Sequence, residues 1–317
     1  MSELALAAFA SETGTHLVRP PATRQWHTYV RAFDARAYLG ALAARGYRFV
    51  ARSTHAFPPG LRAIHDPPSG LFVRGSADLE LLARPAVAIV GARACSGYGA
   101  SVARMLGREL GQAGLVVVSG LARGVDAEAH RGALEAHAPT VAVLGCGIDR
   151  DYPAAHAELA RRIAAEGLLV SEYAPGVEPA PWRFPARNRI VAGLCAATVV
   201  VEARERSGAL ITADLALEEG REVFAVPGEI ASALSAGTNN LLKLGAAPLT
   251  SSADVLASFG LEAAGRPVDG GLLDLLPATA DELVRRTGLP AAEIARALVE
   301  LELDGAAAAH DGVYRIR

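Results

Sequence analysis

Short apolar runs separated by amphipathic stretches dominate the chain between residues 86 and 226. Apolar residues in 98–111 recur near helical spacing, and 126–135 has the pattern of another helix. Strands that alternate with helices at this pitch need right-handed crossovers and form a parallel sheet covered on both faces. The pattern therefore predicts an α/β fold with an extended Rossmann-like, doubly wound, mostly parallel sheet. The predicted strands are 86–90, 115–118, 140–144, 168–170, 198–201 and 222–226.

The region before this sheet has weaker patterns. Only 35–44 has a clear helical pattern, and we expect 1–56 to be a short N-terminal helical region without an independent core. Residues 57–70 are extended and punctuated by prolines, and the apolar 71–73 predict one added strand. The sheet domain is therefore expected over 57–259.

The pattern changes again after the sheet. Glycine and proline in 260–270 are typical of a linker, and three short helices and a hairpin with an Asp-Gly turn then predict a winged helix over 271–317. The third helix has a net charge of −3, so a phosphate-lined groove would repel it. We hypothesise that this domain contacts protein or regulates the main site. The expected helices are 272–276, 280–287 and 291–304.

Composition narrows the function classes. No apolar run reaches the roughly 18 residues of a membrane span, and the N-terminus lacks a secretory pattern, so we expect a cytoplasmic protein with no membrane partner. Three widely spaced cysteines indicate neither zinc nor a disulfide framework, and we expect no cofactor. The net charge of −3 excludes a general positive field, so any nucleic-acid site must be local.

A glycine-bearing loop follows the first predicted strand. Arg93 stands where a dinucleotide-binding fingerprint requires its second glycine, and no acidic residue ends the second strand to hold a ribose. These differences disfavour an NAD-linked oxidoreductase. An arginine directly after a strand suits a phosphate instead, and Ser96 is placed to cap a helix whose N-terminus attracts anions. The alternative is a tight turn with a surface arginine.

The loop after the second strand, 119–126, carries glycines on either side of Arg123. Asp126 is a good N-cap for the next helix, and this structural role competes with a chemical one. His130 could face a cleft one turn further on, although a lone histidine is more often packed. No serine or cysteine is placed to give it a nucleophile, and the histidines lack metal-like spacing.

The segment before the fifth predicted strand combines arginines with aromatic rings. Arg183, Arg187 and Arg189 are interleaved with Trp182 and Phe184. This is the composition of a single-stranded nucleic-acid channel, in which arginines hold the backbone and rings stack on bases. The alternative is a surface loop whose rings pack into the core.

Two later loops add polar groups. Residues 204–212 bring arginines, hydroxyls and a glycine, and 237–243 present amide donors and Lys243, the only lysine of the chain. Because the carboxyl ends of parallel strands meet at one edge of a sheet, we expect these loops to form one phosphate-binding surface.

These motifs, taken in order, resemble the DprA/Smf family (DNA processing protein A) over about 57–256. The resemblance implies an extended Rossmann domain that binds single-stranded DNA without cutting it, forms homodimers and helps to load the RecA recombinase. In competent bacteria this protects incoming DNA and promotes natural transformation. The motifs are 90–93, 119–126, 171–172, 184–189, 202–203, 207–212, 226–228 and 237–241.

The chain departs from the family pattern at two places. Residues 1–50 are too short and unpatterned to supply the family's SAM-like helical module whole, and Ala92 stands where the family has Ser or Thr. The second change removes one hydroxyl donor, for which Ser96 or backbone amides could compensate. The residues expected to bind DNA or phosphate are Gly91, Arg93, Ser96, Gly120, Arg123, Gly124, Phe184, Arg187, Asn188, Arg189, Ser207, Gly208, Thr212, Asn239 and Lys243.

Two rival functions remain open on the sequence. One is a nucleotide-hydrolysing Rossmann enzyme resembling lysine-decarboxylase-like phosphoribohydrolases, with Glu172 and Glu202 as candidate acids. Those enzymes carry a Pro-Gly-Gly-x-Gly-Thr run, and its glycines are missing from 206–212. The other is a reader of duplex DNA through the winged helix, which the acidic third helix opposes. We therefore expect a non-catalytic protein.

Overall fold

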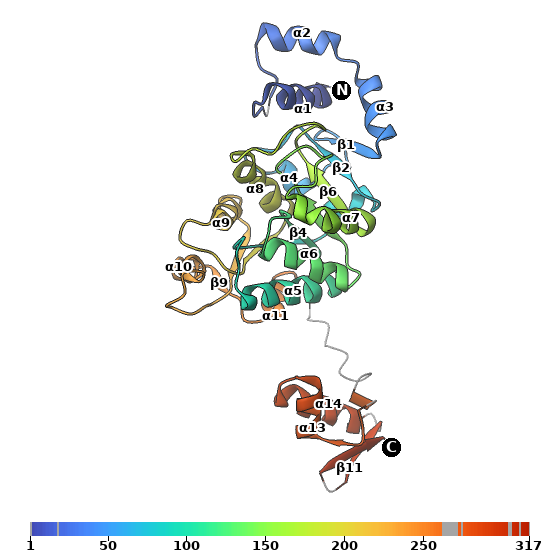
Figure 1. The fold of residues 1–317 in the computed structure, drawn as a ribbon, viewed down its shortest axis with the longest axis vertical. Coiled ribbons are helices and arrows are strands. Elements are labelled where there is room, and N and C mark those ends of the chain that lie inside the picture. Colours follow the sequence, from blue (N-terminus) through green and yellow to red (C-terminus); the bar gives the residue numbers. More distant parts are fainter. Residues whose placement is uncertain are drawn as a thin grey trace. The chain divides into compact units, whose positions relative to one another are not determined.

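The apolar runs form the strands of one nine-stranded sheet, within the part of the chain that the structure describes (Figure 1). This computed structural model describes residues 2–17, 19–261, 272–273, 275–303, 306–310 and 312–316. The strand order is β1-β2-β6-β5-β4-β3-β7-β8-β9, and the strands from β6 to β9 in this order run parallel. The predicted fold class is therefore confirmed. The parallel strands are β3 (Ala86–Val90), β4 (Val116–Ser119), β5 (Thr140–Val143), β6 (Leu168–Ser171), β7 (Ala197–Val200), β8 (Glu222–Ala225) and β9 (Ala247–Pro248).

Two antiparallel strands extend the sheet at one edge. β1 (Tyr47–Ala51) pairs with β2 (Gly70–Arg74), and β2 pairs with β6. The strand predicted at 71–73 is thus present, and β1 is a strand that the sequence pattern did not predict. Between these strands and β3 lie α4 (Pro59–Arg62) and the short 3-10 helix η1 (Leu79–Ala83).

Helices cover both faces of the sheet, as alternating strands and helices require. Alternate side chains of the buried strands point to opposite faces, so Val87 and Ile89 meet the helices on one face while Ala88 and Val90 meet those on the other. The first face carries α5 (Gly97–Gln112), α6 (Val125–Glu135), α7 (Ala157–Glu166) and α11 (Ser252–Ser258). The second carries α4, α8 (Arg183–Leu194), α9 (Gly208–Glu218) and α10 (Ala236–Lys243), and η2 (Ala154–His156) precedes α7.

Three helices precede the sheet: α1 (Ser2–Thr13), α2 (Arg24–Ala32) and α3 (Ala35–Ala44). The predicted helix at 35–44 is present. Aromatic rings pack between α1 and α2, with Phe9 against Trp26 at 5.4 Å between ring centroids. Leu4 and Leu42 pack in the same cluster as the β2 residue Phe72. These helices therefore share their core with the sheet, and residues 1–263 form one compact unit.

The second compact unit covers 264–317. Its three-stranded sheet has the order β10-β12-β11, and the described apolar residues of its two long helices form a separate core. Most of the predicted linker, 262–270, and the turn residue Asp311 lie outside the described residues; of the helix predicted at 272–276, Leu272 and Leu273 are helical and Asp274 is likewise outside. The elements are β10 (Ala278–Thr279), α13 (Ala280–Thr287), α14 (Ala291–Leu303), β11 (Ala307–His310) and β12 (Val313–Ile316).

Candidate nucleic-acid interface

A crevice opens where the strand order reverses. From β3, one crossover leads to β4 and onward to β6, while the later strands β7 to β9 continue on the other side of β3. In such sheets the loops at the carboxyl ends of the two central strands diverge and leave a ligand site. The structure has a pocket of about 380 Å³ at this place. The loops after β3, β4 and β7 and the first turns of α8 and α9 line it.

Three arginines line this pocket with exposed side chains. Arg93 follows β3, and Arg204 and Arg206 follow β7. Within the described chain none of the three forms an ion pair, and the Arg93 guanidinium lies 5.5 Å from the centre of the Phe184 ring. Three positive charges without ion pairs around one concavity attract an anion.

The N-terminus of α9 opens into the same pocket. Ser207 is its N-cap, with a side chain that accepts a hydrogen bond from the Ala209 N–H at 3.3 Å. The first turn of α9 carries no acidic residue, and Gly208 is exposed. Backbone N–H groups at such a helix start, together with the helix dipole, bind phosphate. Ser207, Gly208 and Thr212 all line the pocket, so the structure brings these predicted residues together with Arg93.

The N-terminus of α5 is occupied from within the chain. Ser96 caps the helix as predicted, accepting a hydrogen bond from the Gly99 N–H, and its own N–H and Oγ donate to the Glu202 carboxylate at 2.8 and 2.5 Å. Glu202 is only 5% exposed, and a side chain at Gly99 would collide with it. This carboxylate takes the position at the helix start where a Rossmann protein binds a pyrophosphate. Ser96 is therefore bound internally and does not line the pocket, which corrects its predicted role.

Two buried charges hold the floor of the pocket. Arg187 is 4% exposed, and its Nη1 donates to the carbonyls of Gly120, at 2.8 Å, and Val143. The Asp126 carboxylate accepts from the N–H groups of Gly120 and Ala122 at 3.1 and 3.3 Å. Burial raises the pKa of Asp126, which the Arg187 guanidinium opposes, and burial lowers the pKa of Arg187. The two charges thus fix both polar groups of the Gly120 backbone.

We call the contacts of Arg187 and Asp126 with the Gly120 backbone the clamp, and these contacts change two predicted roles. Asp126 lies inside the first turn of α6, and the N-cap is Gly124, whose φ of +73° favours glycine. A β-carbon at Gly120 would lie 2.4 Å from Arg187 Nη2, so glycine is required by the buried guanidinium. Arg187 lines the pocket, but its hydrogen bonds to buried carbonyls make its role mainly structural. His130 is packed: it is fully buried, and its Nδ1 shares a hydrogen bond with Thr140.

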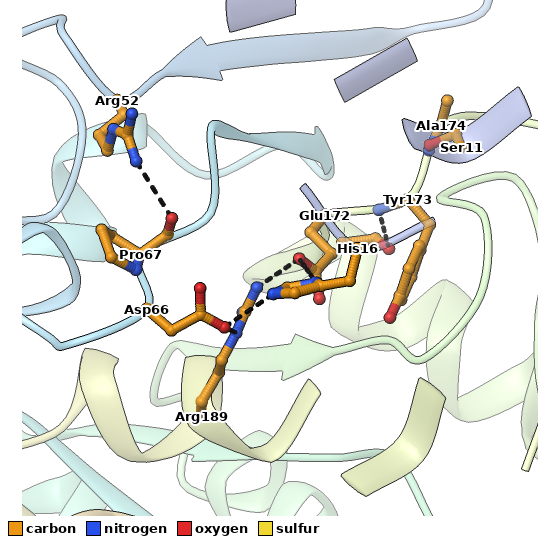
Figure 2. A network of polar contacts seen from close by, with 10 residues as sticks. Ser11, His16, Arg52, Asp66, Pro67, Glu172, Tyr173, Ala174 and Arg189 are labelled. Carbon is orange, nitrogen blue, oxygen red and sulfur yellow. Dashed lines mark hydrogen bonds and ion pairs between the residues drawn. The ribbon is translucent and has the colours of Figure 1, made fainter. Parts of the chain in front are cut away.

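Arg189 lies away from the pocket, in a network of polar contacts (Figure 2). Its Nε donates to Asp66 at 2.9 Å and its Nη2 to Glu172 at 2.6 Å, and His16 Nε2 shares a hydrogen bond with Asp66 Oδ2 at 2.7 Å. Residues two apart on a helix point about 200° away from each other, so Arg187 and Arg189 cannot face one ligand. The prediction that Arg189 holds DNA is corrected for this reason: its side chain is only 9% exposed and is already paired with Asp66 and Glu172.

This network predicts a pH dependence of stability. Burial raises the pKa of Asp66, but Arg189 and the His16 hydrogen bond outweigh burial and hold that pKa below its usual value. A depressed carboxyl pKa adds stability that is present above the unfolded-state value of about 4 and is lost as pH falls through the folded-state value. Asp66→Asn should therefore lower the free energy of unfolding most at pH 6–7 and progressively less below about pH 4, as urea unfolding at several pH values would measure. Asn at the exposed Asp214 is the control, and an Asp66→Asn effect that grew toward low pH would contradict this.

Four further predicted residues lie at this pocket or next to it. Gly91 and Asn188 line the pocket, and the Asn188 amide donates to the Gly208 carbonyl at 3.2 Å. Arg123 is exposed beside the pocket without lining it, and Gly124 packs against the Ala92 carbonyl.

Asn239 and Lys243 line a second pocket, of about 650 Å³. The Asn239 side chain bonds both polar groups of the Gly228 backbone, and Lys243 is exposed. Glu205 lines this second pocket, and Arg204 and Arg206 on either side of it line the first. The single expected surface is thus two pockets that share one loop.

The prediction missed two contributors. The role of Glu202 at the start of α5 was not predicted, because its partner Ser96 is 106 residues away in the sequence. Tyr152 was not considered, although it stacks on Phe184 with ring centroids 5.3 Å apart. An exposed aromatic residue in the loop after a predicted strand was the available signal for Tyr152.

The crevice lies at the switch point of a doubly wound sheet and is lined by guanidinium groups and an open helix start, which are the features by which Rossmann-type proteins bind phosphate. Residues 48–260 match the family model described as DNA recombination-mediator protein A, and 271–313 match the DprA winged helix domain. The chain belongs to this DprA/Smf family.

Relatives and solved structures support the same family assignment. The chain is 48% identical to DNA processing protein DprA of Streptococcus pneumoniae over 64% of this chain and 71% of that protein, and 38% identical to Protein Smf of Escherichia coli over 84% and 77%. The crystal structure of the S. pneumoniae protein covers 74% of this chain and 83% of its own, with a TM-score of 0.68 and 42% identity. A structure of DNA processing protein A from Helicobacter pylori, described for its single-stranded DNA binding mode, covers 67% and 95% with a TM-score of 0.61 and 32% identity. Among the described residues, no helix has the length and apolar character to cross a membrane.

Proposed function

We propose that this protein is a non-catalytic, single-stranded DNA-binding recombination mediator. The observation that carries the proposal is the set of three exposed arginines without ion pairs, Arg93, Arg204 and Arg206, around the open N-terminus of α9. A concave pocket receives a single strand, whereas reading a duplex requires an element that projects into a groove. The H. pylori relative described with single-stranded DNA supports the same ligand class.

The same geometry disfavours the hydrolase. A general acid or base needs a carboxyl group within reach of the substrate. Glu202 is bound to Ser96, and Glu172 is paired with Arg189. Asp126, the carboxylate that lines the pocket, accepts two backbone hydrogen bonds from the floor. These carboxylates are therefore committed to holding the fold.

In the cell, we propose, the DNA-binding activity of the sheet domain, 57–259, serves to protect incoming single strands and to help load RecA during natural transformation. The protein would act in the cytoplasm as a homodimer, with the winged helix 271–317 contacting protein or regulating the main site. Glu302, an exposed acidic residue of α14, and the −3 charge of 291–304 support a partner other than DNA for this helix.

A titration tests this function. Labelled oligo-dT should bind much more tightly than duplex of equal length, and its affinity should fall steeply between two salt concentrations, since each neutralised phosphate on a single strand contributes a slope of about −0.7. Nucleoside monophosphates incubated with the protein should release no free base. Equal affinity for duplex, or release of base, would contradict the proposal.

A further inference from the structure

Glu202, at the end of β7, holds the turn between β3 and α5 at both of its ends. Its backbone carbonyl accepts a hydrogen bond from the Ala92 N–H at 2.7 Å. Its carboxylate accepts from the N–H and the Oγ of Ser96 at 2.8 and 2.5 Å. Arg93 lies between these two anchored residues. The turn that would surround a phosphate in a nucleotide-binding Rossmann protein is therefore folded around a side chain of the chain itself.

The Glu202 carboxylate is buried and has no basic partner. Glu202 is 5% exposed, and within the described residues it forms no ion pair. A carboxylate that leaves water without a cation must gain other donors, because the loss of solvation is costly. Here the donors are the Ser96 groups, and the positive end of the α5 dipole adds to them. These are the groups that hold a phosphate oxygen at a helix start.

The carboxylate also fills the space that a ligand would need. A β-carbon at Gly99 would lie 2.5 Å from Glu202 Oε2, so the side chain packs directly on the bare backbone of the first turn of α5. Ala92 and Arg93 line the crevice, whereas Ser96 does not. The start of α5 thus adjoins the crevice and is closed to it by Glu202.

Both the charge and the volume of Glu202 oppose a second anion at this position. We propose that Glu202 is a specificity-determining residue, whose carboxylate replaces a ligand phosphate at the start of α5 and excludes the pyrophosphate group of free nucleotides. Selectivity of this kind is built against the wrong ligand by a like charge and by occupied space. The phosphates of a strand are left with the open start of α9, so the inference rests on the proposed function. Dissolved nucleotides then cannot dock in the usual Rossmann manner, and the crevice stays available to DNA.

Two substitutions separate the volume of Glu202 from its charge. Glu202→Gln removes the charge and keeps the volume, whereas Glu202→Ala removes both. In calorimetric titrations, inorganic pyrophosphate should bind at least tenfold more tightly to Glu202→Ala than to Glu202→Gln, because only the alanine variant opens the start of α5. Pyrophosphate bound at α9, and any effect of the lost charge, are common to both variants and cancel in this comparison.

Acetate provides an independent measurement on the same variants. It can replace the carboxylate that Glu202→Ala lacks, so it should raise the melting temperature of that variant. The parent protein and Glu202→Gln, in which the position is filled, should show no such rise, and chloride at equal ionic strength is the control. Glu202→Ser opens the same space and is measured in the same way if the alanine variant does not fold.

Two results would overturn the role of Glu202. A folded Glu202→Ala protein that binds pyrophosphate no more tightly than Glu202→Gln, or that acetate does not stabilise, would reduce Glu202 to a cap of α5. The proposed function is tested separately, by oligo-dT titration of the parent protein. Gain of pyrophosphate binding in the variant, without oligo-dT binding by the parent protein, would overturn that function and not the exclusion of pyrophosphate by Glu202.

Discussion

Replacing Arg187 with alanine is expected to lower the free energy of unfolding by about 3–5 kcal/mol, because it removes a buried donor to two carbonyls and the positive charge that opposes the nearby Asp126 charge. The substitution removes the guanidinium that offsets the buried Asp126 carboxylate and leaves the carbonyls of Gly120 and Val143 without this donor. The loop after β4 would lose its fixed position, and single-stranded DNA binding should fall with it. Urea unfolding followed by circular dichroism measures the loss.

A double-mutant cycle controls this prediction. Asp126→Asn should cost less stability in the Arg187→Ala protein than in the parent protein, because the charge it removes is then uncompensated. Coupling of this sign identifies the clamp as the cause. A loss below about 1 kcal/mol for Arg187→Ala, or additive effects of the two substitutions, would show that the clamp does not support the pocket floor.

The combined replacement of Arg93, Arg204 and Arg206 by alanine should abolish most single-stranded DNA affinity while leaving the fold intact. The three side chains are exposed and form no ion pair in the described chain, so their loss removes no internal salt bridge and only the exposed contact between Arg93 and the Phe184 ring. If each holds one phosphate, the salt slope should fall by about 2 in total, and affinity at 0.1 M salt by about 100-fold. Anisotropy titrations of oligo-dT at several salt concentrations measure both quantities.

A second triple variant controls for the change in net charge. Arg31, Arg36 and Arg162 are exposed on α2, α3 and α7, and their replacement by alanine also removes three positive charges. It should change the slope by much less than the pocket variant. Equal changes in the two variants would assign the binding to the overall field of the protein and contradict the local pocket.

Much of the sheet could be predicted from the sequence. The strands β3 and β8 begin at the predicted residues, and β4, β5, β6 and β7 agree within one residue at most ends. Such short apolar runs, bounded by glycine and polar residues, are strands because they are buried on both faces. Because the carboxyl ends of parallel strands lie at one edge of the sheet, the glycine loops were expected to meet there, and Gly91, Gly120 and Gly208 do line one pocket.

The rest depended on contacts that the sequence pattern does not show. α1 was missed because its alanines and leucines are apolar all round and give no helical periodicity. The segment with Arg187 and Arg189 was interpreted as a channel of converging arginines. It is a helix, and the Arg187 side chain points toward the pocket while the Arg189 side chain points away from it. The partner of Arg189, Asp66, is 123 residues away in the sequence, so no local pattern could assign the pair.

The central claim is that phosphates of an unpaired strand occupy the crevice at the carboxyl ends of β3 and β7. A crystal structure of the protein with oligo-dT tests it most directly. We expect a phosphate within hydrogen-bonding distance of the N–H groups at the start of α9 and of at least one of Arg93, Arg204 and Arg206. A strand bound elsewhere, with no phosphate in this crevice, would contradict the account.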